Sequence, residues 1–497
     1  MKTRNEKIFF LFVLVTILLL SLAYTPYFLP NDLFYDIKIG DFILQHGIDL
    51  KDHFSYFSFL PYTYPHWGFD VILSIVYRNF SYNGIHIFLI ICCFFLLLLS
   101  YGLSLRMNKN DNHLTSYLSL FLIGSFMKNG ITPRAQVLSY LLFIIQIYVL
   151  ETFLQKKNKR ILLLLPILSF LLANIHGTIW PFFFILFLPY IMEWLCFKYL
   201  KKKNINIKTY NKKLFVENFS SFRVVFLFIF LSFLVGFFTP SFGIALTYFI
   251  KIMHTTTVHF ILEHQPLILA NNIQYFLLLL CLFLLFILSK TKIRVRDFFM
   301  IFGLIFASFF SVRHTFLFAC CGLVFFFRYL NDLLNEESSS TMDILYSYLQ
   351  KPIVEVILLL FLIFFAYSSV EQNKAKREKL EGYPMGAVSY INQNLDKKSM
   401  RIFNQYEDGG YLLFNDIKVF IDSRSDLYTK EFNKKMDIFD DYIQVDRKLE
   451  YKKVFEKYKI THVLLTKNSN IEKLLSKDTS YKKIYIDEKF VLYEKQK

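Results

Sequence analysis

A short hydrophilic stretch near the N-terminus concentrates side chains that can take part in acid–base chemistry. Residues 31–56, NDLFYDIKIGDFILQHGIDLKDHFSY, contain five aspartates, two histidines and two glycines. The stretch directly follows a run of apolar residues long enough to cross a bilayer, which takes about twenty residues. The rest of the chain must explain why a cluster of acids lies at the end of a membrane span.

Other ionisable and polar side chains recur at the ends of the later apolar segments. They lie on the side of the predicted membrane opposite the loops rich in lysine and arginine. Taken alone, an arginine there is more often an interfacial anchor and a histidine a packing residue. Acids, guanidiniums and imidazoles gathered on one side favour a shared site instead. The set comprises Asp32, Asp36, Asp41, His66, Arg134, Gln136, Asn174, His176, Glu263, His264, Arg313 and His314.

Carboxylates and guanidiniums together suit the transfer of a group from a phosphate to a hydroxyl. The hydroxyl needs a carboxylate that accepts its proton, and the phosphate leaving group needs Arg or His to stabilise its developing charge. Arginine binds phosphate through two parallel hydrogen bonds, which lysine cannot do. Nucleotide donors are not available outside the cell. If these residues face the outside, the activated group must therefore arrive on a lipid.

The elements that position these residues are predicted to be membrane helices. The chain has 497 residues, of which 55% are hydrophobic, and it includes 60 phenylalanines. This composition predicts a polytopic α-helical membrane protein with about eleven spans. The spans are expected near 8–29, 85–105, 114–128, 135–154, 160–175, 178–197, 222–239, 273–290, 297–312, 314–330 and 352–370.

Basic residues predict the orientation of these spans. The net charge is +17, and lysines and arginines concentrate before the first span and in alternate loops, such as KYLKKKNINIKTYNKK and KTKIRVR. The positive-inside rule then places the N-terminus in the cytoplasm and residues 30–84 outside. No recognition motif for nucleic acid accompanies the charge, so we expect no nucleic-acid partner. The six cysteines lie in or beside apolar segments and predict neither disulfides nor a zinc site.

The chain changes character after residue 370. Residues 371–497 are charged and contain short strand-like runs, among them RIFNQY, YLLFN, IKVFID and HVLLTK. The run IYIDEKFVLYEK predicts a pair of strands that turns at Asp487–Glu488. We predict two domains: a transmembrane domain at 1–370, which includes the outer loop 30–84, and an extracytoplasmic soluble α/β domain at 371–497. In the motifs YEDGGY and IDSRSDLY, Gly409–Gly410 are expected to form a turn between strands and Asp422, Arg424 and Asp426 an internal ion network. An acceptor-binding surface is the alternative.

Several of these stretches, in order along the chain, resemble the GT-C superfamily of membrane glycosyltransferases, in a poorly characterised bacterial branch. The resemblance rests on DLFYDIKIGDFILQHGIDLKDHFSY and PHWGFDVIL in the first outer loop, then on TPRAQ, NIHG, TPSFG and LEHQP, and on NQYEDGGYLLFNDIKVFIDSRSDLY near the C-terminus. It spans nearly the whole chain, although each motif alone is weak. The chain departs from the pattern at Asp36, where a histidine is usual, at Phe34 and Tyr35, which replace tryptophans, and in TPRAQ, which lacks a proline after the arginine.

The resemblance implies an inverting glycosyltransferase in the plasma (inner) membrane. It would move a sugar from a polyprenyl-phosphate carrier to a glycan, lipid or protein on the outer face. By position, Asp32 would be the catalytic base, with Asp36 as the second catalytic candidate. Asp36, His66 and Glu263 would position the acceptor or sugar, or hold a divalent metal ion if one is needed. Arg134, His176 and Arg313 would contact the lipid phosphate, and Gln136 lies in the same motif as Arg134.

Two further functions remain open on the sequence alone. A flippase or transporter for lipid-linked glycans would need ionisable or broken-helix features near the bilayer midplane. A non-catalytic membrane subunit would use its outer domain to bind a partner, and Asp32 would then be replaceable without loss.

Overall fold

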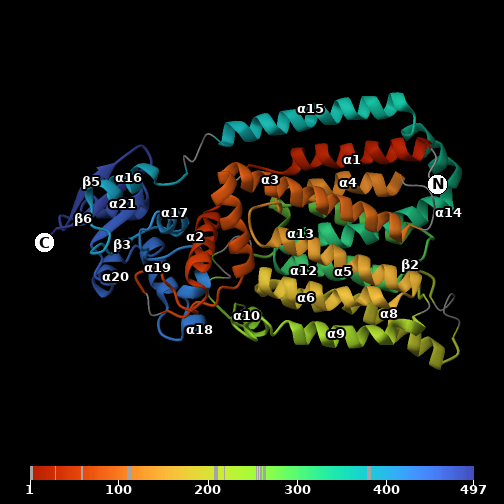
Figure 1. The fold of residues 1–497 in the computed structure, drawn as a ribbon, viewed down its shortest axis with the longest axis horizontal. Coiled ribbons are helices and arrows are strands. Elements are labelled where there is room, and N and C mark those ends of the chain that lie inside the picture. The colour runs from red at the N-terminus through yellow and green to blue at the C-terminus, as the bar shows by residue number, and fades with distance from the viewer. Residues whose placement is uncertain are drawn as a thin grey trace. The chain divides into compact units, whose positions relative to one another are not determined.

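The computed structural model describes residues 4–27, 29–57, 60–108, 114–205, 211–217, 219–252, 254–255, 257, 260, 265–377 and 382–496 (Figure 1). The chain forms two compact units, each built from three stretches of sequence. Unit 1 consists of Met1–Tyr27, His86–Thr239 and Ile261–Lys374. Unit 2 consists of Phe28–Ile85, Pro240–Phe260 and Ala375–Lys497.

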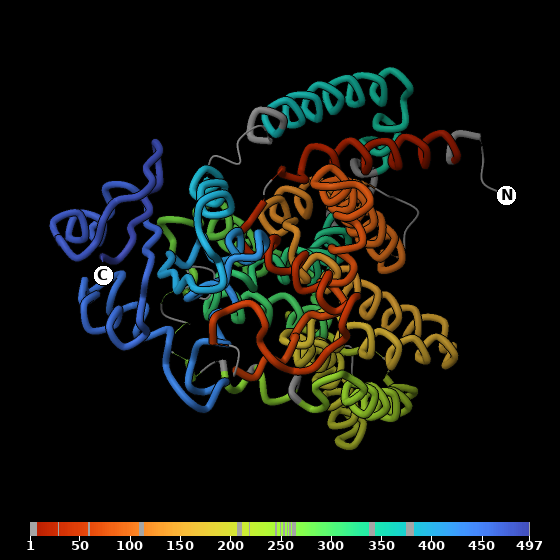
Figure 2. Tube along the Cα trace, turned by 60° about the vertical axis from the view of Figure 1, so that its left-hand side comes forward, coloured from red at the N-terminus to blue at the C-terminus, as the bar shows by residue number. Residues whose placement is uncertain are grey.

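Unit 1 is a bundle of helices whose long members run in nearly the same direction (Figure 1). The side chains of α15 donate hydrogen bonds to the end of α1, from Ser369 to the Ala23 carbonyl at 2.6 Å and from Asn373 to the Thr25 carbonyl at 3.0 Å. Figures 1 and 2 accordingly show α15 beside α1. The helices are α1 (Arg4–Tyr24), α4 (Leu114–Met127), α5 (Gln136–Lys156), α6 (Leu164–Ile175), α7 (Trp180–Ile185), α8 (Leu188–Lys202), α9 (Arg223–Val235), α11 (Ile273–Leu288), α12 (Val295–Phe310), α13 (His314–Leu317), α14 (Leu323–Leu349) and α15 (Pro352–Arg377).

Six helical segments of the described chain are long and apolar enough to cross a membrane, which supports a membrane protein. They are Lys7–Tyr24, Trp67–Met107, Gln136–Lys156, Gly177–Lys202, His314–Glu336 and Pro352–Asn373. Three shorter apolar helices cover Leu114–Met127, Ser220–Val235 and Ile273–Leu288. Helix occurs at each of the eleven predicted segments, but the number of membrane crossings stays a prediction.

Unit 2 begins with two helices that carry the acidic stretch. Helix α2 (Asn31–His46) starts after Pro30 and is followed by Gly47, whose positive φ of 78° is one that glycine adopts readily. Helix α3 (Trp67–Met107) has a non-helical residue at Ser81, with φ 54° and ψ −155°, close to the boundary between the two units. The two helices cross closely, because a Cβ on Gly40 would lie 2.0 Å from the carbonyl oxygen of Asp70.

A four-stranded sheet lies in the C-terminal part of unit 2, in the order β3–β4–β6–β5. β3 (Ile402–Phe403) pairs in parallel with β4 (His462–Thr466), and β4 pairs antiparallel with β6 (Phe490–Lys495), which pairs antiparallel with β5 (Tyr481–Ile486). The accompanying helices are α10 (Ile244–Ile252), α16 (Met385–Asn394), α17 (Tyr406–Phe414), α18 (Lys430–Asn433), α19 (Ile438–Asp446), α20 (Tyr451–Lys457) and α21 (Asn470–Leu475). A separate two-stranded pair in unit 1 joins β1 (Leu214–Phe215) to β2 (Ile293–Arg294) in parallel.

The hydrophobic core of unit 2 combines the outer loop with the C-terminal segment. Tyr35, Ile39 and Phe57 belong to the same buried cluster as Phe420 and Leu464. Each such side chain contributes roughly 1.5–3 kcal/mol when fully buried. The outer loop and the C-terminal segment therefore stabilise each other. The domain boundary at residue 370 stays a prediction.

Local predictions for the C-terminal segment are partly confirmed. The run HVLLTK forms β4, and β5 and β6 form the predicted hairpin, with Asp487 accepting backbone hydrogen bonds in its turn. The predictions of a strand at YLLFN and a turn at Gly409–Gly410 are wrong, because both lie in α17. The two glycines serve close packing instead: a Cβ on Gly409 would lie 2.1 Å from the Ile421 carbonyl oxygen, and one on Gly410 would lie 2.3 Å from that of Asn31.

Candidate functional site

Three ionisable side chains converge where α2 meets the start of α3. The Nδ1 atom of His66 lies 2.8 Å from Asp70 Oδ1 and 3.6 Å from Asp36 Oδ1. Asp36 and Asp70 are 2% and 0% exposed, whereas His66 is half-buried. We call Asp36, His66 and Asp70 the acidic trio. The structure thus brings together two predicted residues, Asp36 and His66, and adds Asp70.

The local sequence accounts for this convergence. Asp36 lies one helical turn before Gly40, where α2 touches the backbone of Asp70. His66 and Asp70 are four residues apart, and the backbone N–H of Asp70 donates to the His66 carbonyl at 3.1 Å. This spacing brings both side chains to one face of the first helical turn. The His66–Asp70 pair was therefore visible in the sequence as PHWGFD, but the approach of Asp36 depends on the helix crossing.

Burial and mutual charge change how the trio holds its protons. Burial raises the pKa of Asp36 well above its usual value, and the neighbouring Asp70 carboxylate raises it further. Burial alone would lower the pKa of His66, but the Asp70 and Asp36 carboxylates outweigh it and raise that pKa to about 10. At neutral pH the imidazole of His66 is therefore a cation between two acids.

The trio also suits a divalent cation. One ligand atom from each of Asp36, His66 and Asp70 lies within 4.8 Å of the others. Asp36 Oδ1 and Asp70 Oδ2 are buried and accept no hydrogen bond from the described residues. Carboxylate oxygens with one imidazole nitrogen are ligands that many divalent cations accept. A bound cation would replace the shared protons and add positive charge at this place.

Asp32 lies on α2 one turn before Asp36. It is in the first turn of the helix, where a negative charge is stabilised by the N-terminal end of the helix dipole. Its residue is half-buried, in contrast to Asp36. The i, i+4 spacing puts Asp32 and Asp36 on one face of α2, and the charge of Asp32 contributes to the raised pKa of Asp36.

The predicted basic residues lie in unit 1, at the end where α5 and α13 begin. Arg134 precedes α5 and is half-buried, and Gln136 is its first residue. His176 is buried between α6 and the following 3₁₀ turn (Gly177–Ile179), and its Nδ1 lies 2.8 Å from the Ser139 hydroxyl of α5. Arg134, Gln136 and His176 are therefore brought together around the first turn of α5.

Arg313 belongs to the same end of unit 1. It directly precedes α13, and the neighbouring His314 ring lies 4.9 Å from the ring of Phe182 in α7. A Cβ on Gly130, in the turn before α5, would lie 2.8 Å from the Phe316 ring of α13. Gln265 accepts a backbone hydrogen bond from Val312 at 3.0 Å, whereas Glu263 lies outside the described residues.

The C-terminal motif IDSRSDLY forms a buried ion network through Asp422 and Arg424, which confirms the predicted network for these two residues. Arg424 is 2% exposed, and its guanidinium contacts Asp422 at 2.6 Å and Asp52 of the outer loop at 2.7 Å. Asp426 instead accepts a hydrogen bond from Tyr248 at 2.5 Å. The Arg424–Asp52 pair, which the sequence analysis missed, ties this motif to the acidic stretch.

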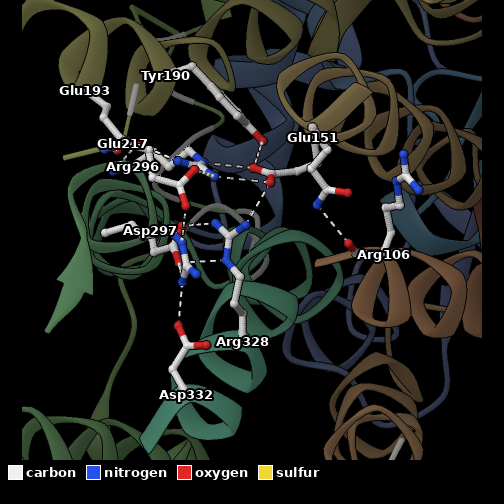
Figure 3. Close-up of polar contacts among 11 residues, drawn as sticks. Arg106, Glu151, Tyr190, Glu193, Glu217, Arg296, Asp297, Arg328 and Asp332 are labelled. Atoms are coloured by element: carbon white, nitrogen blue, oxygen red, sulfur yellow. Dashed lines mark hydrogen bonds and ion pairs between the residues drawn. The ribbon is translucent and has the colours of Figure 1, made fainter. Parts of the chain in front are cut away.

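A second buried ion network lies at the opposite end of α5 in unit 1 (Figure 3). Arg296 of α12 contacts Glu151 of α5 at 3.0 Å and Glu193 of α8 at 2.8 Å. Arg328 of α14 contacts the same Glu151 at 2.7 Å and also pairs with Asp297. The network joins four helices. Because it lies at the end of α5 far from Arg134, we assign this network a structural role in the helix bundle.

Comparisons with known proteins find a similar fold among solved structures but no match by sequence. No protein-family model matches the chain, and no curated protein matches its sequence. The Archaeoglobus fulgidus oligosaccharyltransferase AglB, in complex with an inhibitory peptide and a dolichol-phosphate, aligns with a TM-score of 0.60 at 12% identity, covering 93% of this chain and 70% of that chain. The Archaeoglobus fulgidus oligosaccharyltransferase in the apo form aligns with a TM-score of 0.53 at 12% identity, covering 94% of this chain and 70% of that chain.

A third solved structure agrees with these two. The same oligosaccharyltransferase tethered to an acceptor peptide containing the NVT sequon aligns with a TM-score of 0.52 at 12% identity, covering 92% of this chain and 69% of that chain. The predicted GT-C-like architecture is thereby confirmed at the level of the fold. The chain shares the fold of an archaeal oligosaccharyltransferase.

Proposed function

We propose that this protein is a membrane glycosyltransferase that moves a sugar from a polyprenyl-phosphate carrier to a glycan, lipid or protein on the outer face of the plasma membrane. The observation that carries the proposal is the acidic face of α2. Directly after the first membrane helix, α2 presents Asp32 one turn from Asp36, which is buried against His66 and Asp70. The shared fold with an enzyme solved with dolichol-phosphate supports a lipid-linked donor.

The two aspartates of α2 are suited to different roles. Asp36 is buried and its pKa is raised, so its carboxyl group favours the protonated form more than an exposed aspartate does. Asp32 is more accessible and lies in the first turn of α2. We assign Asp32 as the general base and Asp36 as the group that, with Asp70, orients His66.

In the proposed reaction, Asp32 accepts the proton of an acceptor hydroxyl as its oxygen attacks the anomeric carbon. The bond from that carbon to the phosphate oxygen breaks, and the electron pair leaves with the polyprenyl phosphate. Direct displacement inverts the anomeric configuration. The family resemblance proposes Arg134, His176 and Arg313 as contacts for the phosphate, because guanidinium and imidazole groups stabilise its increasing charge. A cation held by the trio would supply further positive charge.

The proposal includes an orientation. The basic loops favour a cytoplasmic N-terminus, with the outer loop and the C-terminal segment outside. A cysteine at the exposed Asp49 should then react with a membrane-impermeant maleimide in intact cells. A cysteine at the exposed Lys202, in the last turn of α8, should react only after the cells are opened. The reverse pattern of labelling would overturn the orientation.

The function is tested by replacing Asp32 in cells. A deletion strain is complemented with the wild-type chain, with Asp32→Asn, or with the matched control Asp49→Asn, which changes an exposed acid of the same loop that pairs with His53. Mass spectrometry of surface glycans should show one glycan lost in the Asp32→Asn strain and retained in the control. Full activity of Asp32→Asn at equal membrane expression would overturn the proposed base and favour a non-catalytic subunit.

A further inference from the structure

The start of α2 is held by a helix almost four hundred residues later in the chain. Helix α17 packs against α2 within unit 2. The side-chain amide of Asn31 donates a hydrogen bond to Glu407 Oε2 at 2.8 Å. Asn31 is the residue directly before Asp32, so this contact acts on the helical turn that carries the proposed base.

The backbone approach of α17 reinforces this contact. A Cβ on Gly410 would lie 2.3 Å from the Asn31 carbonyl oxygen, so only glycine allows the observed distance. On its other side, α17 is pressed against Ile421 and Asp422, because a Cβ on Gly409 would lie 2.1 Å from the Ile421 carbonyl oxygen. Helix α17 is therefore fixed between the start of α2 and the segment that holds the buried Arg424.

Aromatic contacts hold the same turn of α2 in place. The ring of Phe34, two residues after Asp32, lies 4.7 Å from the ring of Tyr383 and 5.1 Å from that of Tyr411 in α17. The hydroxyl of Tyr383 donates to the Leu29 carbonyl at 2.6 Å. The C-terminal segment thus contacts the chain immediately before and after Asp32.

Glu407 differs from these packing residues because it is exposed. An exposed carboxylate contributes little to folding, because water competes for its hydrogen bonds and screens its ion pairs. Its bond to Asn31 is therefore poorly explained as a stabilising contact. We propose that Glu407 is a positioning residue of the transferase, which acts through Asn31 to set the direction of Asp32. The inference rests on the proposed function of Asp32.

Variants at both ends of the hydrogen bond test the inference in the deletion strain. Glu407→Ala should reduce the surface glycan by about ten- to a hundredfold, because displacement of a catalytic group by about 1 Å costs up to a hundredfold in rate. Glu407→Gln keeps an oxygen that can accept from Asn31 and should restore most of the product. Asn31→Ala should resemble Glu407→Ala, and the double variant should lose no more than either single variant.

A matched control removes another exposed contact to α2. Asp416, just after α17, pairs with Lys38 at 2.6 Å, two turns after Asp32. Asp416→Ala should leave the glycan unchanged, and neither Glu407→Ala nor Asn31→Ala should lower the thermal unfolding midpoint in detergent below that of Asp416→Ala. Equal product from Glu407→Ala and Asp416→Ala would overturn the positioning role, as would additive losses in the double variant. If Asp32→Asn also retains its product, the proposed function itself fails.

Discussion

At the scale of single residues, the acidic trio combines two carboxylates with one imidazole. Its negative charge exceeds its positive charge unless an additional proton or a cation is bound. Two buried carboxylates share one imidazole, and two of their oxygens accept no hydrogen bond from the described residues. Like charges at this distance raise one another's pKa until a proton or a metal ion compensates them. The state of the trio is therefore open to direct measurement.

We predict that the purified protein binds Mn²⁺ at the trio. Electron paramagnetic resonance of free Mn²⁺ should show about one bound ion per chain at neutral pH. Asp70→Asn removes a negative ligand and should weaken binding at least about tenfold, whereas the exposed Asp49→Asn should bind like the wild type. Equal binding by Asp70→Asn, or none by the wild type, would mean that the trio is a proton-sharing ion pair.

A second buried acid should make stability depend on pH. Asp408 in α17 is 4% exposed, and its Oδ2 atom accepts no hydrogen bond from the described residues. Burial, with the charge of Glu407, raises its pKa from 3.8 to about 7. Because the folded-state value is the higher one, this stabilising contribution is complete below about pH 4 and is lost as the pH rises towards 7.

Asp408→Asn should therefore raise the thermal unfolding midpoint at pH 8 while changing it little at pH 4.5. The asparagine stays neutral at both values, so the pH dependence of unfolding should flatten over this range. Measurements by intrinsic fluorescence in detergent should show the midpoint of the wild type falling more steeply with pH than that of Asp408→Asn. Parallel curves would contradict a buried carboxyl that titrates near neutrality.

At the scale of elements, the end of unit 1 that carries Glu151 is held by charge as well as by apolar packing. Arg296 contacts Glu151, Glu193 and Glu217 at 3.0, 2.8 and 2.9 Å, and it is 2% exposed. Removing one partner of a buried ion pair leaves the others uncompensated, at a cost of about 3–5 kcal/mol.

Arg296→Met should consequently lower the thermal unfolding midpoint of the detergent-purified protein strongly. Arg223→Met, which changes an exposed arginine at the start of α9, should change it little. Gel-filtration profiles of the fluorescently tagged variants would show the same order of stability. A midpoint for Arg296→Met equal to that of Arg223→Met would mean that apolar packing alone holds these helices.

The elements that the sequence predicts well are those with a long local signal. Apolar runs are sufficient to locate the helices of unit 1, and the alternation around Asp487 locates the hairpin of β5 and β6. The aromatic and apolar run YLLFN predicts a strand, yet it forms part of α17. There tertiary packing overrides local propensity, since Gly409 and Gly410 let α17 approach its neighbours closely.

At the scale of the whole molecule, the chain interleaves distant segments within each unit. Asp52 and Arg424 are 372 residues apart, and Asn31 and Glu407 are 376 apart, yet each pair is in contact. Such pairs leave no periodic pattern in a single sequence, so the sequence does not indicate that Asp70, Arg424 and Glu407 contact the acidic stretch. His66 and Asp36 could be predicted because their residue types and motif already indicated chemistry.

The central claim concerns what the protein consumes, and lipid-linked sugars are its most direct test. Lipids extracted from the deletion strain are incubated with purified wild-type protein or with Asp32→Asn, and polyprenyl-phosphate sugars are quantified by mass spectrometry. We predict that one such lipid accumulates in the deletion strain. The wild-type protein, but not Asp32→Asn, should convert it to free polyprenyl phosphate when membranes bearing the acceptor are added. Identical lipid pools in wild-type and deletion strains, with no turnover by the wild-type protein, would contradict the account.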